Sequence, residues 1–332
     1  MIPTSNQLVT VFGGSGFVGR HVVRALARRG YRIRVAVRRP DLALFLQPLG
    51  RVGQIHPVQA NVRYPASIAA ALEGADAAVN LVGILNPGGA QTFEAVQAQG
   101  ARAVAEAARQ AGITRFVQMS ALGADPDSDS AYARTKAAGE AAAMEAVPSA
   151  VVMRPSIVFG PEDSFFNRFA ALARVSPVIP LIGGGETRFQ PVFVGDVAEA
   201  ICRVMDATVR TGVTYELGGP EVKTFRQLIQ YVLDITGRRR LLVSMPVGAA
   251  RVQAGVTEFV NKVTGGLVPD ALMLTGDQVR LLQVDNVVSD AAIAEGRTLE
   301  AMGVTPEIIE AVVPAYLYRF RARGQFDAGK FA

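Results

Sequence analysis

The chain has 332 residues, half of them hydrophobic, and a formal net charge of +5 at pH 7, which suits one large domain or two smaller ones. With one cysteine, Cys202, and two histidines, the sequence excludes an intramolecular disulfide and gives no Cys/His zinc site at any usual spacing. No uncharged apolar run reaches the roughly 18 residues that a membrane-spanning helix needs, and the start carries no export or organelle signal, so we expect an intracellular protein.

The first half of the chain alternates short β-branched runs with Ala-rich helical patterns. This alternation predicts a parallel sheet covered by helices on both faces. Gly30, Gly74 and Gly112 stand where helices are expected to end. The expected strands are Leu8–Phe12, Ile33–Val37, Ile55–Ala60, Ala78–Val82, Phe116–Met119 and Ala150–Met153, and the expected helices include Val18–Arg29, Phe93–Ala111 and Ala131–Glu145.

After Arg154 several prolines break the chain into short pieces. A helix over residues 196–207 and a strand over residues 214–217 are expected to return to the first sheet. We therefore predict an α/β protein with a doubly wound parallel sheet in residues 1–155, completed by about residues 189–218. Residues 156–188 and 219–332 are expected to form a smaller, discontinuous and mostly helical C-terminal part.

A glycine-rich turn joins the first expected strand to the first helix. Gly13, Gly16 and Gly19 form GxxGxxG inside a βαβ unit of suitable length. Gly13 permits the tight turn, Gly16 lets a pyrophosphate approach N–H groups at the helix N-terminus, and Gly19 lets the helix pack close to the strand. We expect this loop, including Ser15 and Phe17, to bind a dinucleotide in a Rossmann domain. The alternative is a plain strand-to-helix turn.

The end of the second strand indicates which dinucleotide is bound. An NAD-preferring site places Asp or Glu there for the ribose 2′-OH, whereas this chain has Arg38 and Arg39. Guanidinium groups suit a 2′-phosphate, so the predicted cofactor is NADPH, unless these arginines are only surface charges. At the end of the third strand, Asn61 and Val62 are expected to flank the adenine.

Tyr132 and Lys136 form a YxxxK pair on an expected helix. Residues four apart share one helix face, so both side chains can point into one cleft. A nearby ammonium stabilises a tyrosinate, which would make Tyr132 a general acid or base at a carbonyl being reduced. Lys136 would also hydrogen-bond the nicotinamide ribose.

Several segments together resemble one enzyme family. Residues 13–19, 132–136, 154–161, 196–198 and 215–219 resemble the extended short-chain dehydrogenase/reductases, and the resemblance covers about residues 7–235. Within that family, residues 119–124, 160–167 and 190–197 resemble the atypical branch that contains the NADPH-binding accessory subunit of mitochondrial complex I.

This resemblance implies a cofactor role and partners. In the atypical branch NADPH is tightly held and structural, and the subunit lies on the matrix arm near the membrane and the quinone site. Ser120, Pro155, Ser156 and Ile157 are then expected to contact NADPH. The expected partners are peripheral-arm subunits of complex I near the quinone site, in a bacterial counterpart of the mitochondrial subunit.

One position departs from the active members of the family. They carry Ser or Thr two residues after the first Ser at the end of the fifth strand, where this chain has Leu122. The lost donor is worth about 2.7–4 kcal/mol if oxyanion-hole values transfer. We therefore expect a non-catalytic NADPH-binding accessory subunit of respiratory complex I (NADH:ubiquinone oxidoreductase), with Tyr132 and Lys136 as ribose ligands only. Two alternatives remain open, namely an active NADP-dependent reductase or nucleotide-sugar epimerase, and a soluble NADP(H)-sensing regulator.

A helical run is expected over residues 307–323, after Pro306. Aromatic residues alternate with arginines near its end, which suits an anionic lipid headgroup layer or an acidic protein groove, the alternative being a helix packed on its own domain. We expect a peripheral protein on the cytoplasmic face of the inner membrane, and no nucleic-acid partner, because the arginines are spread along the chain. A second apolar helix face lies within residues 257–263. The residues concerned are Tyr316, Tyr318, Phe320 and Phe326, Arg319, Arg321 and Arg323, and Phe259, Val260 and Val263.

Overall fold

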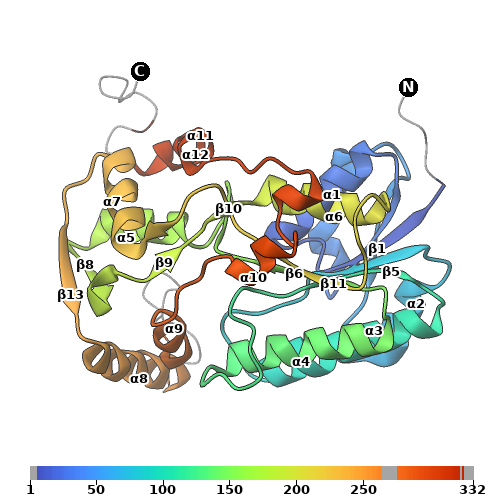
Figure 1. Ribbon diagram of the computed structural model, residues 1–332, viewed down its shortest axis with the longest axis horizontal. Coiled ribbons are helices and arrows are strands. Elements are labelled where there is room, and N and C mark those ends of the chain that lie inside the picture. The colour runs from blue at the N-terminus through green and yellow to red at the C-terminus, as the bar shows by residue number, and fades with distance from the viewer. Residues whose placement is uncertain (1–5, 264–274, 322–323, 325–332) are drawn as a thin grey trace. The chain divides into compact units, whose positions relative to one another are not determined.

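The computed structural model describes residues 6–263, 275–321 and 324 and divides into two compact units (Figure 1). The first unit comprises the described residues of 1–155, 194–217 and 288–306, and the second those of 156–193, 218–287 and 307–332. The sequence predicts residues 288–306 in the smaller part. They belong to the first unit because the Glu216 carboxylate accepts the backbone N–H of Ser289 at 2.7 Å and the strand of Glu216 bridges to Thr298.

The first unit is built on a seven-stranded sheet in which all neighbouring strands are parallel. Its strand order is β11-β6-β5-β4-β1-β2-β3, so the order reverses between β1 and β4. This is the switch point of a doubly wound Rossmann fold, which confirms the predicted fold class. The strands are β1 (Leu8–Phe12), β2 (Arg32–Val37), β3 (Ile55–Gln59), β4 (Ala77–Asn80), β5 (Arg115–Met119), β6 (Val151–Pro155) and β11 (Val213–Leu217).

Helices cover both faces of this sheet, which is why its central strands are apolar on both sides. One group contains α1 beside α6 and the other contains α2, α3 and α4, and Figure 1 shows the two groups on opposite sides of the strands. The helices are α1 (Phe17–Arg28), α2 (Pro65–Leu72), α3 (Gln99–Gln110), α4 (Ala131–Ala146), α6 (Val194–Met205) and α10 (Asp290–Ala294), with 3-10 segments at Pro40–Leu49 and Glu300–Met302.

Glycines end the helices where the sequence predicts. Gly30, Gly74 and Gly112 have φ values of +85°, +67° and +71°, a region that glycine adopts without steric cost. The helix expected over residues 93–111 differs at its start, because a π-helical segment, Glu94–Ala98, precedes α3. Within this wider turn the buried Gln97 donates a hydrogen bond to the carbonyl of Ile84 at 2.6 Å.

The second unit packs helices against three two-stranded sheets, β7–β10, β9–β12 and β8–β13. Its core is rich in phenylalanine contributed largely by α5, α7 and the short strands. Residues 189–193, which the sequence predicts in the first domain, belong here because β9 and β10 pair within this unit. The elements are β7 (Val158–Phe159), α5 (Phe166–Val175), β8 (Val178–Ile182), β9 (Arg188–Phe189), β10 (Val192–Phe193), β12 (Lys223–Thr224), α7 (Phe225–Thr236), β13 (Leu241–Met245), α8 (Val247–Val263), α9 (Gly276–Leu281), α11 (Ile309–Val312) and α12 (Pro314–Leu317), with 3-10 turns at Gly183–Gly185 and Tyr318–Phe320.

The prediction of one continuous C-terminal helix is wrong. The chain forms the short helices α11 and α12 and then a 3-10 turn, and Pro314, which has no N–H to continue a helix, begins α12. Tyr316 and Phe320 are buried in the core of the second unit, and the Tyr316 hydroxyl donates to Asp163 at 2.5 Å. These two aromatic residues therefore serve the unit's own core. Phe326 and Arg323 lie outside the described residues, as do the side chains of Phe259, Val260 and Val263.

Candidate functional site

The glycine loop folds as the sequence predicts. Gly13 has φ +76°, and a Cβ added there would lie 3.3 Å from the backbone of Leu81 and Val82. A Cβ on Gly19 would lie 2.6 Å from the Gly14 Cα, so only glycine lets α1 begin this close to the loop. Glycine is thus required at Gly13 for conformation and at Gly19 for packing.

The N-terminus of α1 opens onto this loop. Its N-cap residue is Gly16, which has no side chain to accept the first N–H groups, so an anion can take that role. Beyond it, the Phe17 ring packs edge-on against His21 with ring centroids 5.9 Å apart. The carbonyls of Ser15 and Gly16 accept hydrogen bonds from the Arg20 guanidinium at 3.4 Å. The loop is therefore braced by Arg20 while its backbone N–H face remains suited to a pyrophosphate.

The two arginines after β2 differ in their surroundings. Arg39 forms a two-point contact with the Asp41 carboxylate at 2.8 and 3.1 Å. Arg38 is exposed and has no hydrogen-bond or ion-pair partner within the described part of the chain. Of the two predicted phosphate ligands, Arg38 is therefore the one whose guanidinium is ready to bind.

Asn61 and Val62 follow β3 and have local structural roles. The Asn61 backbone N–H donates to the Ser67 hydroxyl, and its side-chain oxygen accepts the backbone N–H of Arg63 at 3.1 Å. Val62 is 7% exposed and belongs to the core beneath α2 and α3. Contact of these residues with an adenine stays a prediction.

The predicted Tyr–Lys pair lies on α4, which begins where the Ser130 hydroxyl accepts the N–H of Ala133. The Lys136 ammonium donates to the Met119 carbonyl at the end of β5 at 3.3 Å, and it lies 5.8 Å from the centre of the Tyr132 ring. A Cβ added to Gly83, after β4, would lie 3.2 Å from the same ammonium. Lys136 thus stands at the carboxyl edge of the sheet, where the glycine loop contacts the residues after β4.

Burial changes the acidity of Lys136. It lowers the pKa of the ammonium to about 8, and the charge of Glu140 opposes this shift. The Tyr132 ring is held edge-on against Phe93, with ring centroids 5.8 Å apart. The pair therefore has a fixed phenol and an amine that changes charge near neutral pH, which suits either a ribose ligand or an acid–base relay.

A carboxylate–arginine pair that no sequence motif predicts lies behind Lys136. Arg154 on β6 binds Glu140 on α4 through two parallel hydrogen bonds of 2.8 and 2.6 Å, and Glu216 lies 4.0 Å away on β11. Glu140 follows Lys136 by four residues, so it lies on the same helix face. That spacing was the available signal, but the partner on β6 is visible only in the folded chain.

Ser120 and Leu122 follow β5. Ser120 is buried, and its hydroxyl has no hydrogen-bond partner among the described residues. A buried hydroxyl left unpaired is costly, so the atom fits a site that a bound group completes. Leu122 is 7% exposed, and its backbone N–H donates to the carbonyl of Pro155 at 3.0 Å. An aliphatic side chain thus stands at the position where the resemblance implies a hydroxyl in active members.

The remaining predicted ligands divide between the units. Pro155 ends β6 in the first unit, whereas Ser156 and Ile157 belong to the second. Ser156 donates to the Asn286 backbone carbonyl at 2.9 Å and contacts its side-chain oxygen at 2.7 Å. The Ile157 carbonyl accepts the N–H of Val192. Their contact with a nucleotide stays a prediction.

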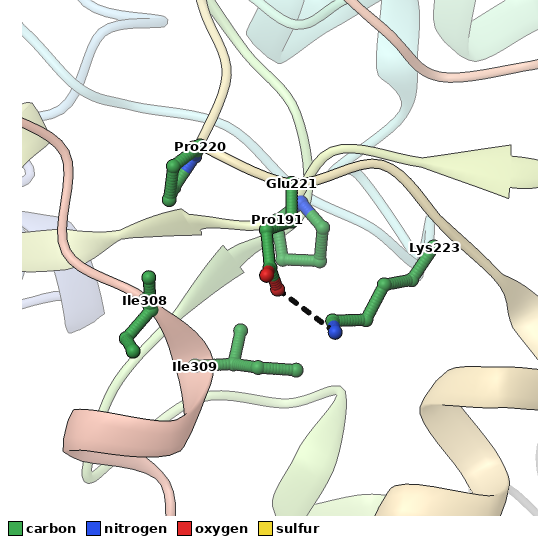
Figure 2. Close-up of a pocket in the computed structure, with 6 residues that line it drawn as sticks. All are labelled: Pro191, Pro220, Glu221, Lys223, Ile308 and Ile309. Atoms are coloured by element: carbon green, nitrogen blue, oxygen red, sulfur yellow. Dashed lines mark ion pairs between the residues drawn. The ribbon is translucent and has the colours of Figure 1, made fainter.

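Other features of the described residues lie apart from the candidate dinucleotide site. Figure 2 shows a pocket in the second unit in which Lys223 pairs with Glu221 at 2.8 Å, and its volume of about 10 Å³ suits one water molecule. Burial raises the pKa of the Cys202 thiol to about 12, which makes it unreactive. No cluster of potential metal ligands and no helix long and apolar enough to cross a membrane occurs among these residues.

Comparison with known proteins identifies relatives along most of the chain. Residues 9–218 match the NAD dependent epimerase/dehydratase family. The chain is 35% identical over 324 residues to NADH dehydrogenase (ubiquinone) 1 alpha subcomplex subunit 9, mitochondrial, of Arabidopsis thaliana, covering 96% of this chain and 79% of that protein. It is 31% identical over 300 residues to the ceramide reductase of Caulobacter vibrioides, covering 89% of this chain and 90% of that protein.

Solved structures share the fold. The NADPH-dependent quinone oxidoreductase of Escherichia coli, complexed with NADPH, superimposes with a TM-score of 0.70 at 20% identity, covering 93% of this chain and 99% of that chain. The UDP-glucose 4-epimerase of Thermotoga maritima, with UDP-glucose, gives 0.66 at 17% identity, covering 95% of this chain and 98% of that chain. The family match extends from β1 to β11 and includes the glycine loop and the Tyr–Lys pair, so this chain belongs to the NAD dependent epimerase/dehydratase family.

Proposed function

We propose that this chain is an NADPH-binding accessory subunit of respiratory complex I, in which the cofactor is structural. The observation that carries the proposal is Leu122, an aliphatic residue at the position where the resemblance implies a hydroxyl in active members, beside the predicted dinucleotide site. Without that donor, charge developing on a substrate oxygen lacks one preorganised partner. We infer the assembly, respiratory complex I, from the relatives that are named as its subunits.

Each part of the cradle has a defined task in this proposal. The glycine loop and the N-terminus of α1 hold the pyrophosphate, and Arg38 holds the 2′-phosphate. Lys136 and Tyr132 hold the nicotinamide ribose, and Ser120 finds in the bound nucleotide the partner that it lacks. NADPH, when bound, supplies a hydride. With Leu122, however, the site lacks the hydroxyl that would hydrogen-bond the oxygen of a carbonyl substrate and orient it.

The assembly sets the location. We place the subunit on the peripheral arm near the quinone site, on the cytoplasmic face of the inner membrane. Tyr318 and Arg319 are exposed in the described C-terminal residues, and Arg319, which also donates to the Asn167 side chain at 2.6 Å, keeps further N–H groups that can bind anionic headgroups. Protein contacts supply the main attachment, because so few exposed groups bind a membrane weakly.

Native purification tests this proposal. The tagged full-length chain is isolated from solubilised membranes, every co-eluting chain is identified, and nucleotide released on denaturation is quantified. We expect the subunits of complex I and NADPH close to one per chain. A chain recovered free of complex I subunits at physiological salt would rule out the assembly.

A second candidate function is an NADP-dependent reductase. The Tyr132–Lys136 pair is intact, and a relative of similar identity is named as a ceramide reductase. Saturable loss of NADPH absorbance with a keto-sphingolipid, abolished by Tyr132→Phe, would establish this function. Negligible turnover with that substrate class, and with quinones and aldehydes, supports the structural role.

A further inference from the structure

Arginines gather in the second unit where α5 and α7 end, and these two helices pack against each other (Figure 1). Two stretches of the chain, residues 164–185 and 235–257, contain six arginines and no Asp or Glu. Four of these arginines lie in the last turn of α5 or directly after α7. We call them the basic cluster, which consists of Arg174, Arg238, Arg239 and Arg240.

Backbone carbonyls hold two arginines of the basic cluster in place. The Arg240 Nε–H donates to the carbonyl of Ala173 in the last turn of α5 at 2.7 Å, and the Arg238 Nε–H donates to the carbonyl of Phe320 at 3.0 Å. Arg240 also donates a terminal N–H to the carbonyl of Arg239 at 3.1 Å. Because a guanidinium has five N–H donors, both side chains are fixed and still keep donors for a further acceptor.

The basic cluster has no counterion within the described part of the chain. None of its four side chains forms an ion pair there, and the nearest carboxylate along the chain, Asp234, accepts a hydrogen bond from the Gln230 amide at 2.8 Å. Burial lowers the pKa of Arg238 below its usual range, and the positive charges of Arg240 and Arg174 lower it further. Like charges are therefore held close together, and an anion bound among them would relieve their repulsion.

Helix capping explains only part of this arrangement. Arg240 satisfies a C-terminal carbonyl of α5, as basic residues at helix ends commonly do. The side chains of Arg174 and Arg239 are exposed, and neither forms a hydrogen bond to another described residue. These two side chains thus add positive charge without a structural task in the folded chain.

Exposed aliphatic side chains border the basic cluster. Val175, which follows Arg174, is 77% exposed, and Leu241, which follows Arg240, is 69% exposed. The Leu241 N–H donates to the carbonyl of Pro177 at 3.1 Å, so the two segments lie side by side. Arginines beside exposed aliphatic groups suit a ligand that joins an anionic head to a hydrocarbon tail.

A phosphate group matches this surface better than a carboxylate or a nucleic acid does. A phosphate monoester carries a charge of about −1.5 to −2 at pH 7 and three acceptor oxygens, and it binds guanidinium groups through paired hydrogen bonds. A carboxylate has one charge and two oxygens, so it would leave more of the positive charge uncompensated. Single-stranded nucleic acids stack their bases on aromatic side chains, whereas Val175 and Leu241 are aliphatic.

We propose that the basic cluster is a binding site for a phosphate monoester group, carried by a phospholipid headgroup or by a soluble compound. This site goes beyond the proposed function, because it needs no complex I subunit. It is also separate from the predicted NADPH ligands of the first unit, since all four arginines belong to the second unit.

Vesicle sedimentation and calorimetry with the purified full-length chain test the two sources of phosphate. Phosphatidylcholine vesicles contain either phosphatidic acid or, at equal negative charge, oleic acid, whose carboxylate replaces the phosphate monoester. Glycerol 3-phosphate, the soluble equivalent of the phosphatidic acid headgroup, is titrated separately. We expect the chain to sediment with the phosphatidic acid vesicles and much less with the oleic acid vesicles.

The other outcomes of these measurements are equally specific. Binding of glycerol 3-phosphate without a preference for phosphatidic acid vesicles would support the site and assign it to a soluble phosphate. Equal sedimentation with both kinds of vesicle and no binding of glycerol 3-phosphate would overturn the proposal in favour of a general attraction between charges. Absence of binding in both measurements would overturn it as well.

Matched double variants show whether the basic cluster is the site. Arg174→Gln with Arg239→Gln removes two exposed side chains that the fold does not use, and should weaken binding to phosphatidic acid vesicles about thirtyfold. Arg109→Gln with Arg251→Gln removes the same charge from exposed positions on α3 and α8, and should weaken it less than about threefold. Equal losses for the two double variants would overturn the proposal.

Discussion

Arg154 and Glu140 hold β6 and α4 together through two parallel hydrogen bonds directly behind Lys136. Glu140 is 7% exposed, so its carboxylate depends on this guanidinium for compensation. The pair therefore fixes the helix that carries the Tyr–Lys motif.

Removing one member of this pair should lower the unfolding free energy. Arg154→Met leaves Glu140 buried without its main partner, and we expect unfolding free energy to fall by about 3 kcal/mol in urea denaturation. Asp41→Asn breaks the exposed Arg39–Asp41 pair and should change the unfolding free energy far less, because solvent screens that pair. If the two variants lose equal stability, the buried pair does not have the role assigned to it.

Cofactor choice should depend on Arg38 more than on Arg39. Arg38→Asp removes an exposed guanidinium that has no partner in the described part of the chain and adds a repelling carboxylate. We therefore expect NADPH affinity to fall at least about tenfold while NADH affinity changes little. Arg39→Asp should have a smaller effect, because Asp41 already engages Arg39. Fluorescence titration with both nucleotides checks this. Equal losses for NADPH and NADH would remove Arg38 from the 2′-phosphate site.

The buried Lys136 should make stability depend on pH. Burial lowers the pKa of its ammonium to about 8 from the usual 10.5, so between these values the unfolded chain keeps a proton that the folded chain has released. The unfolding free energy then rises with pH across this window. Below pH 8 the buried Lys136 ammonium is charged and lowers the unfolding free energy.

Lys136→Met should remove this dependence. The stability of the variant relative to wild type is expected to decline by up to about 3 kcal/mol between pH 7 and 10.5, measured by urea unfolding without nucleotide. Lys223→Met is the control, because Glu221 raises the pKa of Lys223 and no such decline is expected below pH 10. A constant difference between wild type and Lys136→Met would show that the ammonium keeps its ordinary pKa.

Restoring the missing hydroxyl should reveal whether the site retains catalytic capacity. Leu122→Thr supplies the absent donor, and we expect NADPH oxidation with aldehydes, quinones or nucleotide sugars to rise about a hundredfold above a negligible wild-type rate. Adding Tyr132→Phe should abolish the gain. Turnover by wild type equal to that of Leu122→Thr would instead favour the reductase.

Gly19 should tolerate no side chain. Gly19→Ala places a methyl group 2.6 Å from the Gly14 Cα, so we expect a loss of about 1–3 kcal/mol in unfolding free energy and of NADPH binding. Gly248→Ala on α8 meets no atom within 4 Å and should be neutral or stabilising by up to about 1 kcal/mol. Retention of full nucleotide affinity by Gly19→Ala would disprove the close approach of α1 to the loop.

The sequence alone determined the Rossmann sheet, because its signals are local. Strand periodicity, glycine helix ends and the strand–glycine–helix order are each written within a few adjacent residues, and β1, α1 and α4 begin and end within one or two residues of their predicted bounds. The GxxGxxG and YxxxK motifs likewise need only short spacings.

Only the tertiary structure decided which side chains are occupied by neighbours. Arg39 pairs with Asp41, two residues away, whereas the adjacent Arg38 has no partner among the described residues. Arg154 meets Glu140 across a strand and a helix, and Tyr316 meets the buried Asp163. Tyr316 and Phe320, which the sequence predicts on an exposed C-terminal face, are instead buried in the core of the second unit. Such pairings depend on how the chain packs, and no local pattern specifies that packing.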